Sequence, residues 1–367
     1  MAKERVLLSG SNGYVGNALL ASLAHDNPGH EFFCVDHAGR KRWVQESGGI
    51  SLTDYADYAF FAADLSNAQE AARILNYFKP SVIMHLASQP SAPYSEISLA
   101  HRSYTQQNNL QMLLNLITLS HELKLNPKFI VTTTTGVPGA PDQPIEEGPM
   151  TNLAGSSYHV SRGFDSANLA LAARQWKFRI LEMRTAIVYG TRVDGISQPV
   201  TRLDWDYYFG TVIHRFALRT KMNLPITVYG KGEQKKPLIA LRDVVKSLRN
   251  AIECDIKPGH EIVNQVTECL SVMKMAQTVA GDNPIENIPN PRIEKESHQM
   301  VINNAKFMKI LYPGLELFEK DGITMAHGCN STLLGEIDNI LKDIDLSKLP
   351  FNWLDIFEGK IKQGVAA

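Results

Sequence analysis

Arg5-Val-Leu-Leu-Ser9-Gly10-Ser-Asn-Gly13-Tyr-Val-Gly16 is the stretch that decides the fold of this chain. The apolar run that ends at Ser9 predicts a buried strand, and Asn17-Ala-Leu-Leu-Ala-Ser-Leu23 predicts a helix directly after the glycines. Glycines in such a turn let the backbone approach a pyrophosphate closely, and the first turn of the helix offers free N–H groups to it. The stretch therefore predicts a dinucleotide site, and a glycine-rich turn without a ligand is the alternative interpretation.

Beyond this stretch, short apolar runs alternate with helical patterns through the first half of the chain. The alternation predicts an α/β protein with a Rossmann-type, doubly wound parallel sheet. The expected strands cover residues 5–9, 31–35, 60–63, 82–87, 129–133, 179–184 and 259–264, and the expected helices cover 17–23, 66–78, 104–123, 157–173 and 242–252.

After residue 190 the pattern loosens, because prolines, glycines and aromatic residues interrupt it. We therefore expect a dinucleotide-binding domain at residues 1–190, to which residues 237–267 return. A smaller C-terminal substrate-binding lobe is expected at residues 191–236 and 268–367. Helices within 333–341 and 349–361 are expected to be peripheral and to carry no chemistry.

The composition argues against several classes of protein. The 367 residues carry a formal net charge of −1, which gives no reason to expect a nucleic acid or an anionic membrane as partner. No apolar run approaches the roughly 18–20 residues of a membrane helix, and Met1 to Arg5 leads into a strand rather than a signal sequence. The four cysteines lack C-x-x-C spacing, so we assign no metal ligands and no disulfides. We expect a cytoplasmic protein.

Asp36 stands at the carboxyl end of the second expected strand. A carboxylate there can accept both ribose hydroxyls of an adenosine and would repel a 2′-phosphate, which favours NAD over NADP. Arg40, Lys41 and Arg42 follow closely and could instead bind that phosphate. NAD is therefore the expected cofactor, with NADP as the alternative.

Tyr158 and Arg162 lie four residues apart, so on a helix they share one face. A tyrosine is too weak an acid to exchange protons at neutral pH, but a neighbouring cation favours its phenolate. The pair is therefore a candidate acid/base, and a plain surface contact is the alternative. Ligands of such a sheet bind beyond the carboxyl ends of its strands, where the helix of Tyr158 should meet Gly10, Asp36, Ala87 and Thr134.

Together these features resemble the extended short-chain dehydrogenase/reductases of the NAD-dependent epimerase/dehydratase family. Within that family the chain looks like a UDP-sulfoquinovose synthase from about residue 5 to about residue 310. The segments that carry this likeness are Gln89-Pro-Ser-Ala-Pro-Tyr-Ser95, Tyr104-Thr-Gln-Gln-Asn-Asn109, Ile145-Glu-Glu-Gly148, Tyr158-His-Val-Ser161, Val188-Tyr-Gly190, Arg202-Leu-Asp204, Phe209-Gly-Thr211, Thr227-Val-Tyr-Gly-Lys-Gly232, Asn264-Gln265 and Pro289-Asn-Pro-Arg292.

The resemblance implies a nucleotide-sugar substrate, with a UDP-hexose expected. In this family NAD removes a hydride from the sugar C4 while the tyrosine takes the hydroxyl proton. In the synthases the 4-ketone then allows elimination of water across C5–C6, sulfite adds to the alkene, and the hydride returns to C4. By the same resemblance, Thr134 would bond the sugar O4, Tyr158 would be the acid/base, and Arg162 would stand where the family has a lysine. Homodimers through a two-helix face are common in the family.

Motifs and resemblance together define three groups of expected site residues. The expected catalytic residues are Thr134, Tyr158 and Arg162. The expected cofactor contacts are Gly10, Asn12, Gly13, Tyr14, Val15, Gly16, Asp36, Arg40, Asp64, Leu65, Leu86, Ala87, Ser88, Asn109, Tyr158 and Arg162. The expected substrate contacts are Gln89, Ser91, Thr134, Thr185, Thr211, Thr227, Tyr229, Gln234, Lys236 and Arg292.

Three departures from the family pattern leave the reaction open. Arg162 replaces the lysine, and its planar fork cannot place a point charge in the same way. Val137 replaces the glutamate of the loop after the fifth strand, and Thr135-Gly136 stands where dehydratases have an Asp-Glu pair, so an elimination lacks its usual acid and base. Pro90 replaces an arginine that would contact sulfite.

The sequence therefore leaves several functions in competition. A sulfoquinovose-synthase-like enzyme is the nearest named activity, and a 4-epimerase would survive the loss of the loop acids. A protein that keeps the pocket without turnover is a further hypothesis, because of Arg162, Val137 and Pro90. A simple alcohol dehydrogenase on another substrate fits the UDP-pocket segments poorly.

Overall fold

The computed structural model describes residues 3–26, 29–37, 59–138, 147, 155–201, 203, 207–290, 302–327, 331–349 and 354–355. Its largest element is a seven-stranded sheet in the order β10-β6-β5-β4-β1-β2-β3, in which every neighbouring pair is parallel. The expected doubly wound sheet is confirmed, and residues 259–265 return to its edge beside β6. The strands are β1 Arg5–Ser9, β2 Glu31–Asp36, β3 Ala59–Ala62, β4 Val82–His85, β5 Lys128–Thr134, β6 Arg179–Thr185 and β10 Gly259–Gln265.

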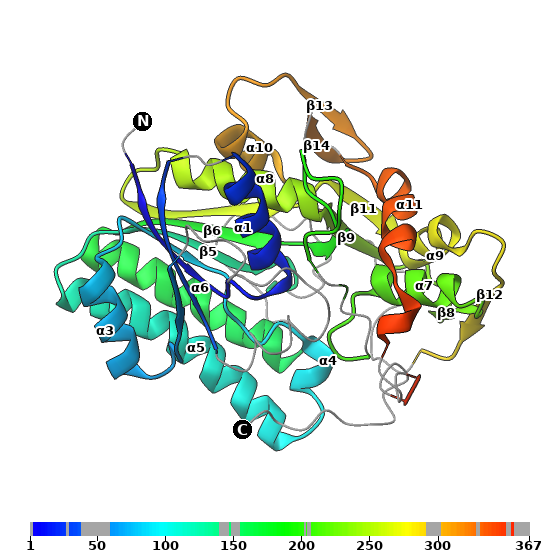
Figure 1. Ribbon diagram of the computed structural model, residues 1–367, viewed down its shortest axis with the longest axis horizontal. Coiled ribbons are helices and arrows are strands. Elements are labelled where there is room, and N and C mark those ends of the chain that lie inside the picture. Colours follow the sequence, from blue (N-terminus) through cyan, green and yellow to red (C-terminus); the bar gives the residue numbers. More distant parts are fainter. Residues whose placement is uncertain are drawn as a thin grey trace.

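Helices cover both faces of this sheet (Figure 1). Side chains alternate along each strand, so in β1 Val6 and Leu8 join one core cluster while Leu7 joins the other. The first cluster packs α1 Tyr14–Asp26, α8 Leu241–Glu253 and α10 Ala305–Leu311 on the sheet, and the second packs α3 Ala68–Phe78, α5 Leu99–Glu122 and α6 Ser157–Trp176.

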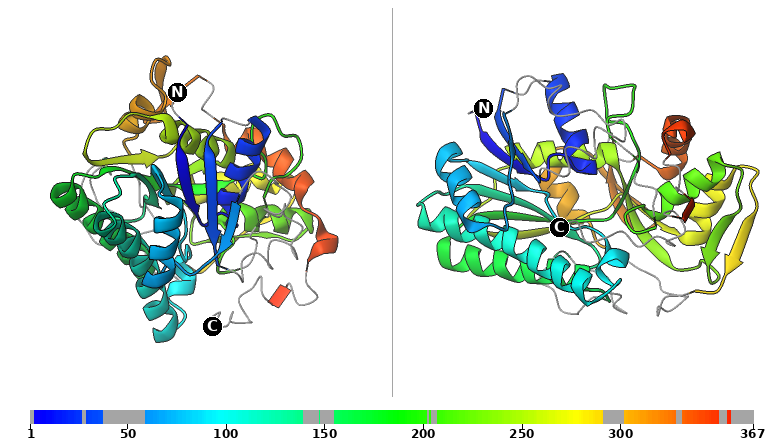
Figure 2. Two further views of the ribbon diagram at one scale, coloured as in Figure 1. Left: turned by 60° about the vertical axis from the view of Figure 1, so that its left-hand side comes forward. Right: turned by 60° about the horizontal axis from the view of Figure 1, so that its bottom comes forward.

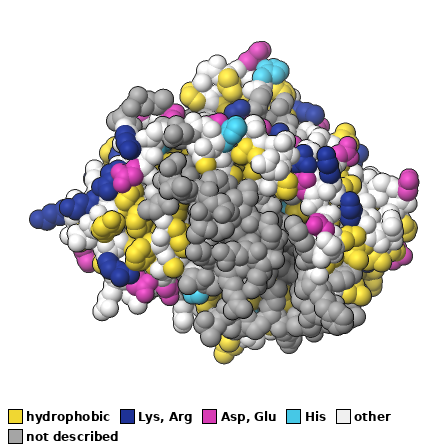
Figure 3. Space-filling view, in the orientation of Figure 1, with side chains coloured by type: hydrophobic (Ala, Val, Ile, Leu, Met, Phe, Trp, Pro, Cys, Tyr) yellow, Lys and Arg dark blue, Asp and Glu magenta, His cyan; other side chains and the backbone are white. Residues whose placement is uncertain are grey.

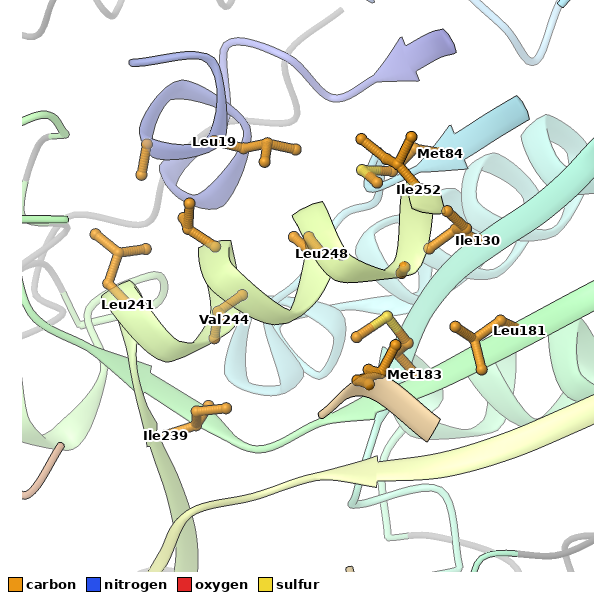
Figure 4. Packing of buried hydrophobic residues seen from close by; sticks show 14 of the residues in the cluster. Leu19, Met84, Ile130, Leu181, Met183, Ile239, Leu241, Val244, Leu248 and Ile252 are labelled. Atoms are coloured by element: carbon orange, nitrogen blue, oxygen red, sulfur yellow. The ribbon is translucent and has the colours of Figure 1, made fainter. Parts of the chain in front are cut away.

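Leu248 illustrates how the first cluster stabilises the fold. It lies on the face of α8 that meets the sheet, among Leu19 of α1 and Met183 of β6 (Figure 4). Its side chain is fully buried, and such burial contributes about 1.5–3 kcal/mol. Because the core cluster around α8 includes side chains of both α1 and β6, this helix joins the first strand–helix unit to the other half of the sheet.

The predicted helix at 104–123 begins earlier than expected, at Leu99 of α5. Ser98 is the reason, because its hydroxyl accepts a hydrogen bond from the His101 N–H and caps the helix. A short helix that was not expected, α4 Ala92–Ser95, precedes it with Ser91 as its cap. The fourth strand ends at His85 rather than Ala87, so Leu86 and Ala87 belong to the loop that faces the glycine turn.

A second lobe stands beside the sheet (Figure 2). Its three-stranded sheet has the order β11-β9-β7, and a second small sheet pairs β12 with β8. A β13–β14 hairpin lies near α10. The bounds are β7 Ile187–Tyr189, α7 Val212–Lys221, β8 Ile226–Tyr229, β9 Lys235–Ala240, β11 Glu268–Ser271, α9 Val272–Ala280, β12 Ile285–Ile288, β13 Leu317–Lys320, β14 Ile323–Ala326, α11 Leu333–Asp343 and a 3₁₀ turn at Leu346–Lys348.

The helix expected at 333–341 contributes to the core of the second lobe. Leu333, Ile337 and Ile340 of α11 are buried in the core of the second lobe with α7 and α9. Asp343 at the end of α11 forms an ion pair with Arg192 at 2.6 Å, so the helix is also fixed to the segment after β7. An apolar stripe of period 3.6 reads the same for a helix that covers a lobe and for one that completes its core. The region 349–361 lies almost wholly outside the described residues.

The described surface in Figure 3 carries lysines and arginines interspersed with aspartates and glutamates. Such mixing agrees with the formal net charge of −1. Among the described helices, each is too short or too polar to cross a membrane.

Candidate active site

The glycine turn between β1 and α1 is closely packed on backbone atoms. Gly10 has φ of +75°, and a Cβ at this position would lie 2.6 Å from the backbone nitrogen of Ala87. A Cβ at Gly16 would lie 2.2 Å from the carbonyl oxygen of Gly10. Gly13 closes the turn by donating its N–H to the Gly10 carbonyl at 3.0 Å. Side chains at Gly10 or Gly16 are therefore excluded sterically, and helix α1 begins directly at this turn.

Polar atoms in this turn fit an anionic ligand. Ser11 and Asn12 are buried, and among the described residues the Ser11 hydroxyl and the Asn12 side-chain nitrogen have no hydrogen-bond partner. Buried polar groups normally have partners, so these two atoms at the start of a helix are suited to a pyrophosphate. The predicted cofactor positions Tyr14 and Val15 follow them in the first turn of α1.

Asp36 ends β2 beside this turn, as expected. One carboxylate oxygen accepts a hydrogen bond from the Asn12 N–H at 2.7 Å, and the other accepts from the His37 N–H at 2.7 Å. The backbone thus fixes the orientation of the carboxylate while leaving it lone pairs for ribose hydroxyls. Arg40, the rival contact for a 2′-phosphate, lies outside the described residues.

Other predicted cofactor positions have structural contacts. Asp64 accepts hydrogen bonds from the N–H and hydroxyl of Ser66, which shapes the turn before α3, and Leu65 is buried. The buried Asn109 amide bonds both backbone groups of Gln89 and also donates to the Ser161 hydroxyl at 3.2 Å. Asn109 therefore fastens the loop after β4, which carries Leu86, Ala87 and Ser88, to α6.

Tyr158 and Thr134 meet at the carboxyl end of β5. The Thr134 hydroxyl interacts with the Tyr158 phenol and lowers its pKa. Burial nevertheless raises the pKa of Tyr158 above its ordinary value, the nearby Arg162 lowers it, and Asp165 raises it. Ser156 caps the helix by accepting the His159 N–H, so the first turn of α6 holds Tyr158 in place.

The Arg162 guanidinium is turned into the protein. Its side chain is 2% exposed, one terminal nitrogen lies 2.7 Å from a carboxylate oxygen of Asp165, and the other donates to the Thr132 carbonyl. The sequence predicts that Arg162 contacts the cofactor, and this stays a prediction; in the structure the guanidinium lies against Asp165 and the Thr132 carbonyl of β5. The partner Asp165 was missed, although an Arg/Asp pair three residues apart on a helix is a recognisable signal.

His159 is the second residue that the sequence analysis missed. A Cβ at Gly136 would lie 2.5 Å from its Nε2, so the imidazole packs directly on the loop after β5. Ser156 Oγ lies 2.8 Å from its Nδ1. Burial and the charge of Lys236 lower the pKa of His159 to about 4, while Glu96 raises it. The ring is therefore neutral near pH 7 and lies where a side chain at Gly136 would otherwise stand.

The predicted substrate positions fall into two groups. Gln89, Ser91 and Thr185 have protein partners: the Gln89 amide bonds Ser91, Ser91 donates to the Tyr208 carbonyl, and Thr185 donates to Gln265 at 2.7 Å. Of the positions in the second lobe, Thr211 caps α7, and Gln234 is buried with its side-chain oxygen unpartnered among the described residues. The remaining positions are Thr227 and Tyr229 on β8, Lys236 on β9, and Arg292, which is outside the described residues.

Tyr14 connects the glycine turn to the second lobe. Its hydroxyl donates to the Gly190 carbonyl, and its ring meets the His214 ring of α7 edge-on at 5.4 Å. Thr201 donates to the Tyr14 carbonyl at 2.8 Å. The side chain expected to face only the cofactor therefore also fixes the two lobes to each other.

Comparison with known proteins agrees with this geometry. Residues 6–264 match the NAD dependent epimerase/dehydratase family, and the chain belongs to that family. It is 31% identical over 353 residues to the chloroplastic UDP-sulfoquinovose synthase of Spinacia oleracea, covering 86% of this chain and 72% of the relative. The UDP-sulfoquinovose synthase of Sulfolobus acidocaldarius is 30% identical, with 80% and 84% covered.

Among solved structures, the UDP-glucuronic acid 4-epimerase of Bacillus cereus in complex with UDP-glucuronic acid and NAD has the same fold. Its TM-score is 0.70 at 19% identity, with 92% of this chain and 99% of that chain covered. The protein is accordingly an NAD-dependent enzyme of the extended short-chain dehydrogenase/reductase type.

Gly16→Ala tests the glycine turn as the cofactor site. The new methyl group would lie 2.2 Å from the Gly10 carbonyl oxygen, so the turn must shift and lose its fit to the pyrophosphate. We expect the affinity for NAD in calorimetry to fall by about tenfold or more, which is about 1.4 kcal/mol. Gly155→Ala is the matched control, because a Cβ there meets nothing within 4 Å. Unchanged NAD affinity in folded Gly16→Ala would contradict the assignment.

Proposed function

We propose that this enzyme modifies a UDP-hexose by transient oxidation at the sugar C4, using NAD. The observation that carries the proposal is that the Thr134 hydroxyl, at the carboxyl end of β5, interacts with the Tyr158 phenol and lowers its pKa. A hydroxyl pair in that position suits a sugar hydroxyl that must lose its proton as a hydride leaves the same carbon. The proposed reaction type agrees with the names of the relatives described above.

In the proposed reaction each side chain has a separate task. Thr134 orients the C4 hydroxyl, and Tyr158 accepts its proton and later returns it. Bound NAD supplies the hydride acceptor and donor. Residues 10–16 and Asp36 hold that cofactor. The positive charge of Arg162 favours the phenolate form of Tyr158.

The second lobe is proposed to grip the nucleotide. The buried Gln234 oxygen is an acceptor without a described partner, and Lys236 supplies a positive charge next to His159. A lysine contacts a phosphate as a point charge. With Thr227, Tyr229 and Arg292, these residues define the proposed UDP contacts, so residues 191–236 and 268–367 form the substrate lobe and 237–267 returns to the NAD lobe.

The first candidate reaction is sulfonation of UDP-glucose with sulfite, as the names of the two relatives described above suggest. It requires a base for the C5 proton once C4 is a ketone. His159 is proposed to be this base in place of the missing loop acids. Its neutral imidazole packs on Gly136, where the dehydratases carry their acidic pair. With its pKa lowered to about 4, the imidazole is unprotonated near pH 7 and therefore free to accept a proton.

The second candidate is a UDP-sugar 4-epimerase. It is favoured by Val137, which stands at the position of the family glutamate and is fully buried. Epimerisation needs only proton transfer by Tyr158 and a turn of the ketone, so it has no use for a loop acid.

The two candidates are separated by incubating the purified protein with UDP-glucose, with and without sulfite, and identifying products by mass spectrometry and NMR. We expect a sulfonated nucleotide sugar with sulfite, and loss of all products in Tyr158→Phe. His159→Gln should stop sulfonation while UDP-glucose still reduces the bound cofactor. UDP-galactose formed without sulfite, and unaffected by His159→Gln, would support the epimerase. UDP binding without any cofactor reduction would contradict both candidates and support a pocket without turnover.

We also propose that the enzyme is a homodimer through the paired helices α5 and α6. Leu114 on α5 and Phe164 and Leu171 on α6 are apolar side chains that remain between 37% and 49% exposed. Phe164→Glu should therefore convert a dimer to a monomer in analytical ultracentrifugation, because a buried unpaired charge opposes association. Tyr77→Glu, on α3 and outside this face, should leave the dimer intact. Equal sedimentation of Phe164→Glu and the unchanged protein would exclude this interface.

A further inference from the structure

Arg162 and Asp165 form a closed pair beneath Tyr158. Asp165 is fully buried and lies one turn after Arg162 on α6, with 2.7 Å between the two charged groups. The second terminal nitrogen of Arg162 donates to the Thr132 carbonyl of β5. Because the Arg162 residue is 1% exposed, it has almost no accessible surface left for a ligand.

The other buried carboxylate in this region is already satisfied by different partners. Glu182 of β6 accepts hydrogen bonds from Thr133 and Ser166, forms an ion pair with Arg184, and lies 2.8 Å from His260 Nε2. Burial alone would raise the pKa of Glu182, but these partners lower it to about 2, so Glu182 is ionised. Asp165 is therefore the carboxylate that balances Arg162.

We propose that Asp165 is a positioning residue of the Tyr158 site, which holds the Arg162 guanidinium against β5. In this position the positive charge of Arg162 acts on Tyr158 only through space. Asp165 also keeps the guanidinium from making a direct contact with a bound ligand. The Tyr-x-x-x-Lys pattern would supply one lysine without an acidic partner. This chain instead has an arginine paired with a buried aspartate. The inference deepens the proposed function, because it concerns the residue assigned there to proton transfer.

The sign of the effect follows from the charges that face Tyr158. Arg162 lowers the pKa of Tyr158 and Asp165 raises it, so the net effect of the pair on this pKa is the difference between the two contributions. His85 of β4 faces the same guanidinium, and burial and Arg162 lower its pKa to about 3, so it is neutral. Burial and the charge of Glu182 raise the pKa of Asp165, Arg162 lowers it, and the resulting value is about 7. Asp165 is therefore ionised at the higher pH at which a phenol titrates. Removal of its charge must therefore lower the pKa of Tyr158.

The test is a titration of tyrosinate absorbance without any nucleotide sugar. The chain has 12 tyrosines, so each variant is compared with the same variant carrying Tyr158→Phe, and the difference isolates Tyr158. In Asp165→Asn we expect Tyr158 to ionise about one pH unit lower, the usual effect of removing a near charge. Asp165→Glu should restore the original titration because it keeps the charge. Ser166→Ala is the matched control, since Ser166 contacts Glu182 rather than Arg162.

Folding of each variant is checked by circular dichroism, and sucrose is added to all samples to favour the folded state. An unchanged Tyr158 titration in folded Asp165→Asn would overturn the proposal, as would equal shifts in Asp165→Asn and Asp165→Glu. The titration is independent of turnover, so it succeeds or fails separately from the proposed reaction. If the proposal and the proposed function both hold, the acidic limb of the pH profile of kcat with UDP-glucose shifts to lower pH in Asp165→Asn, together with the pKa of Tyr158. The same limb keeps its position in Ser166→Ala.

Discussion

A buried positive charge is the constraint on which the centre of this enzyme depends. Arg162 is 1% exposed, and a charge at such a position must be paired or it destabilises the fold strongly. Asp165 and the Thr132 carbonyl supply that pairing, and they belong to α6 and β5, the elements that also carry the proposed catalytic residues Tyr158 and Thr134. The same contacts that keep α6 on β5 therefore decide how much positive charge Tyr158 experiences.

The glycine turn imposes a second, steric constraint that connects the lobes. Gly10 must pass within contact of the loop after β4, and the helix that follows places Tyr14 against Gly190 and His214. Asn109 fixes the loop after β4 to α6 through Gln89 and Ser161. Short-range contacts thus join the glycine turn, helix α6 and the second lobe. A shift of one of these three parts would therefore displace residues of the other two.

Much of the fold follows from the sequence because its signals are local. Apolar runs such as Val82–His85 predict parallel strands buried on both faces, and the glycine turn predicts the first strand–helix unit with its site. Caps are local as well, and Ser98 would have corrected the start of α5. The packing of α11 could not be predicted, since an apolar stripe does not reveal what it packs against.

The candidate site divides in the same way. Thr134 and Tyr158 were predicted together because strand ends of a parallel sheet meet at one edge, and the Thr134 hydroxyl does lower the pKa of Tyr158. The orientation of Arg162 depends on Asp165, and the role suggested for His159 depends on Gly136 leaving room for the ring. These relations arise from side-chain packing between elements, which neither spacing nor a motif specifies.

The most direct test of the account uses UDP-glucose that carries deuterium at C4, in ordinary water. If the sugar is oxidised and reduced by the same cofactor within one active site, the product keeps its deuterium at C4, whichever product forms. NMR and mass spectrometry of the product measure this retention. Loss of the deuterium to solvent, or a product formed without a deuterium isotope effect on cofactor reduction, would contradict transient oxidation at C4.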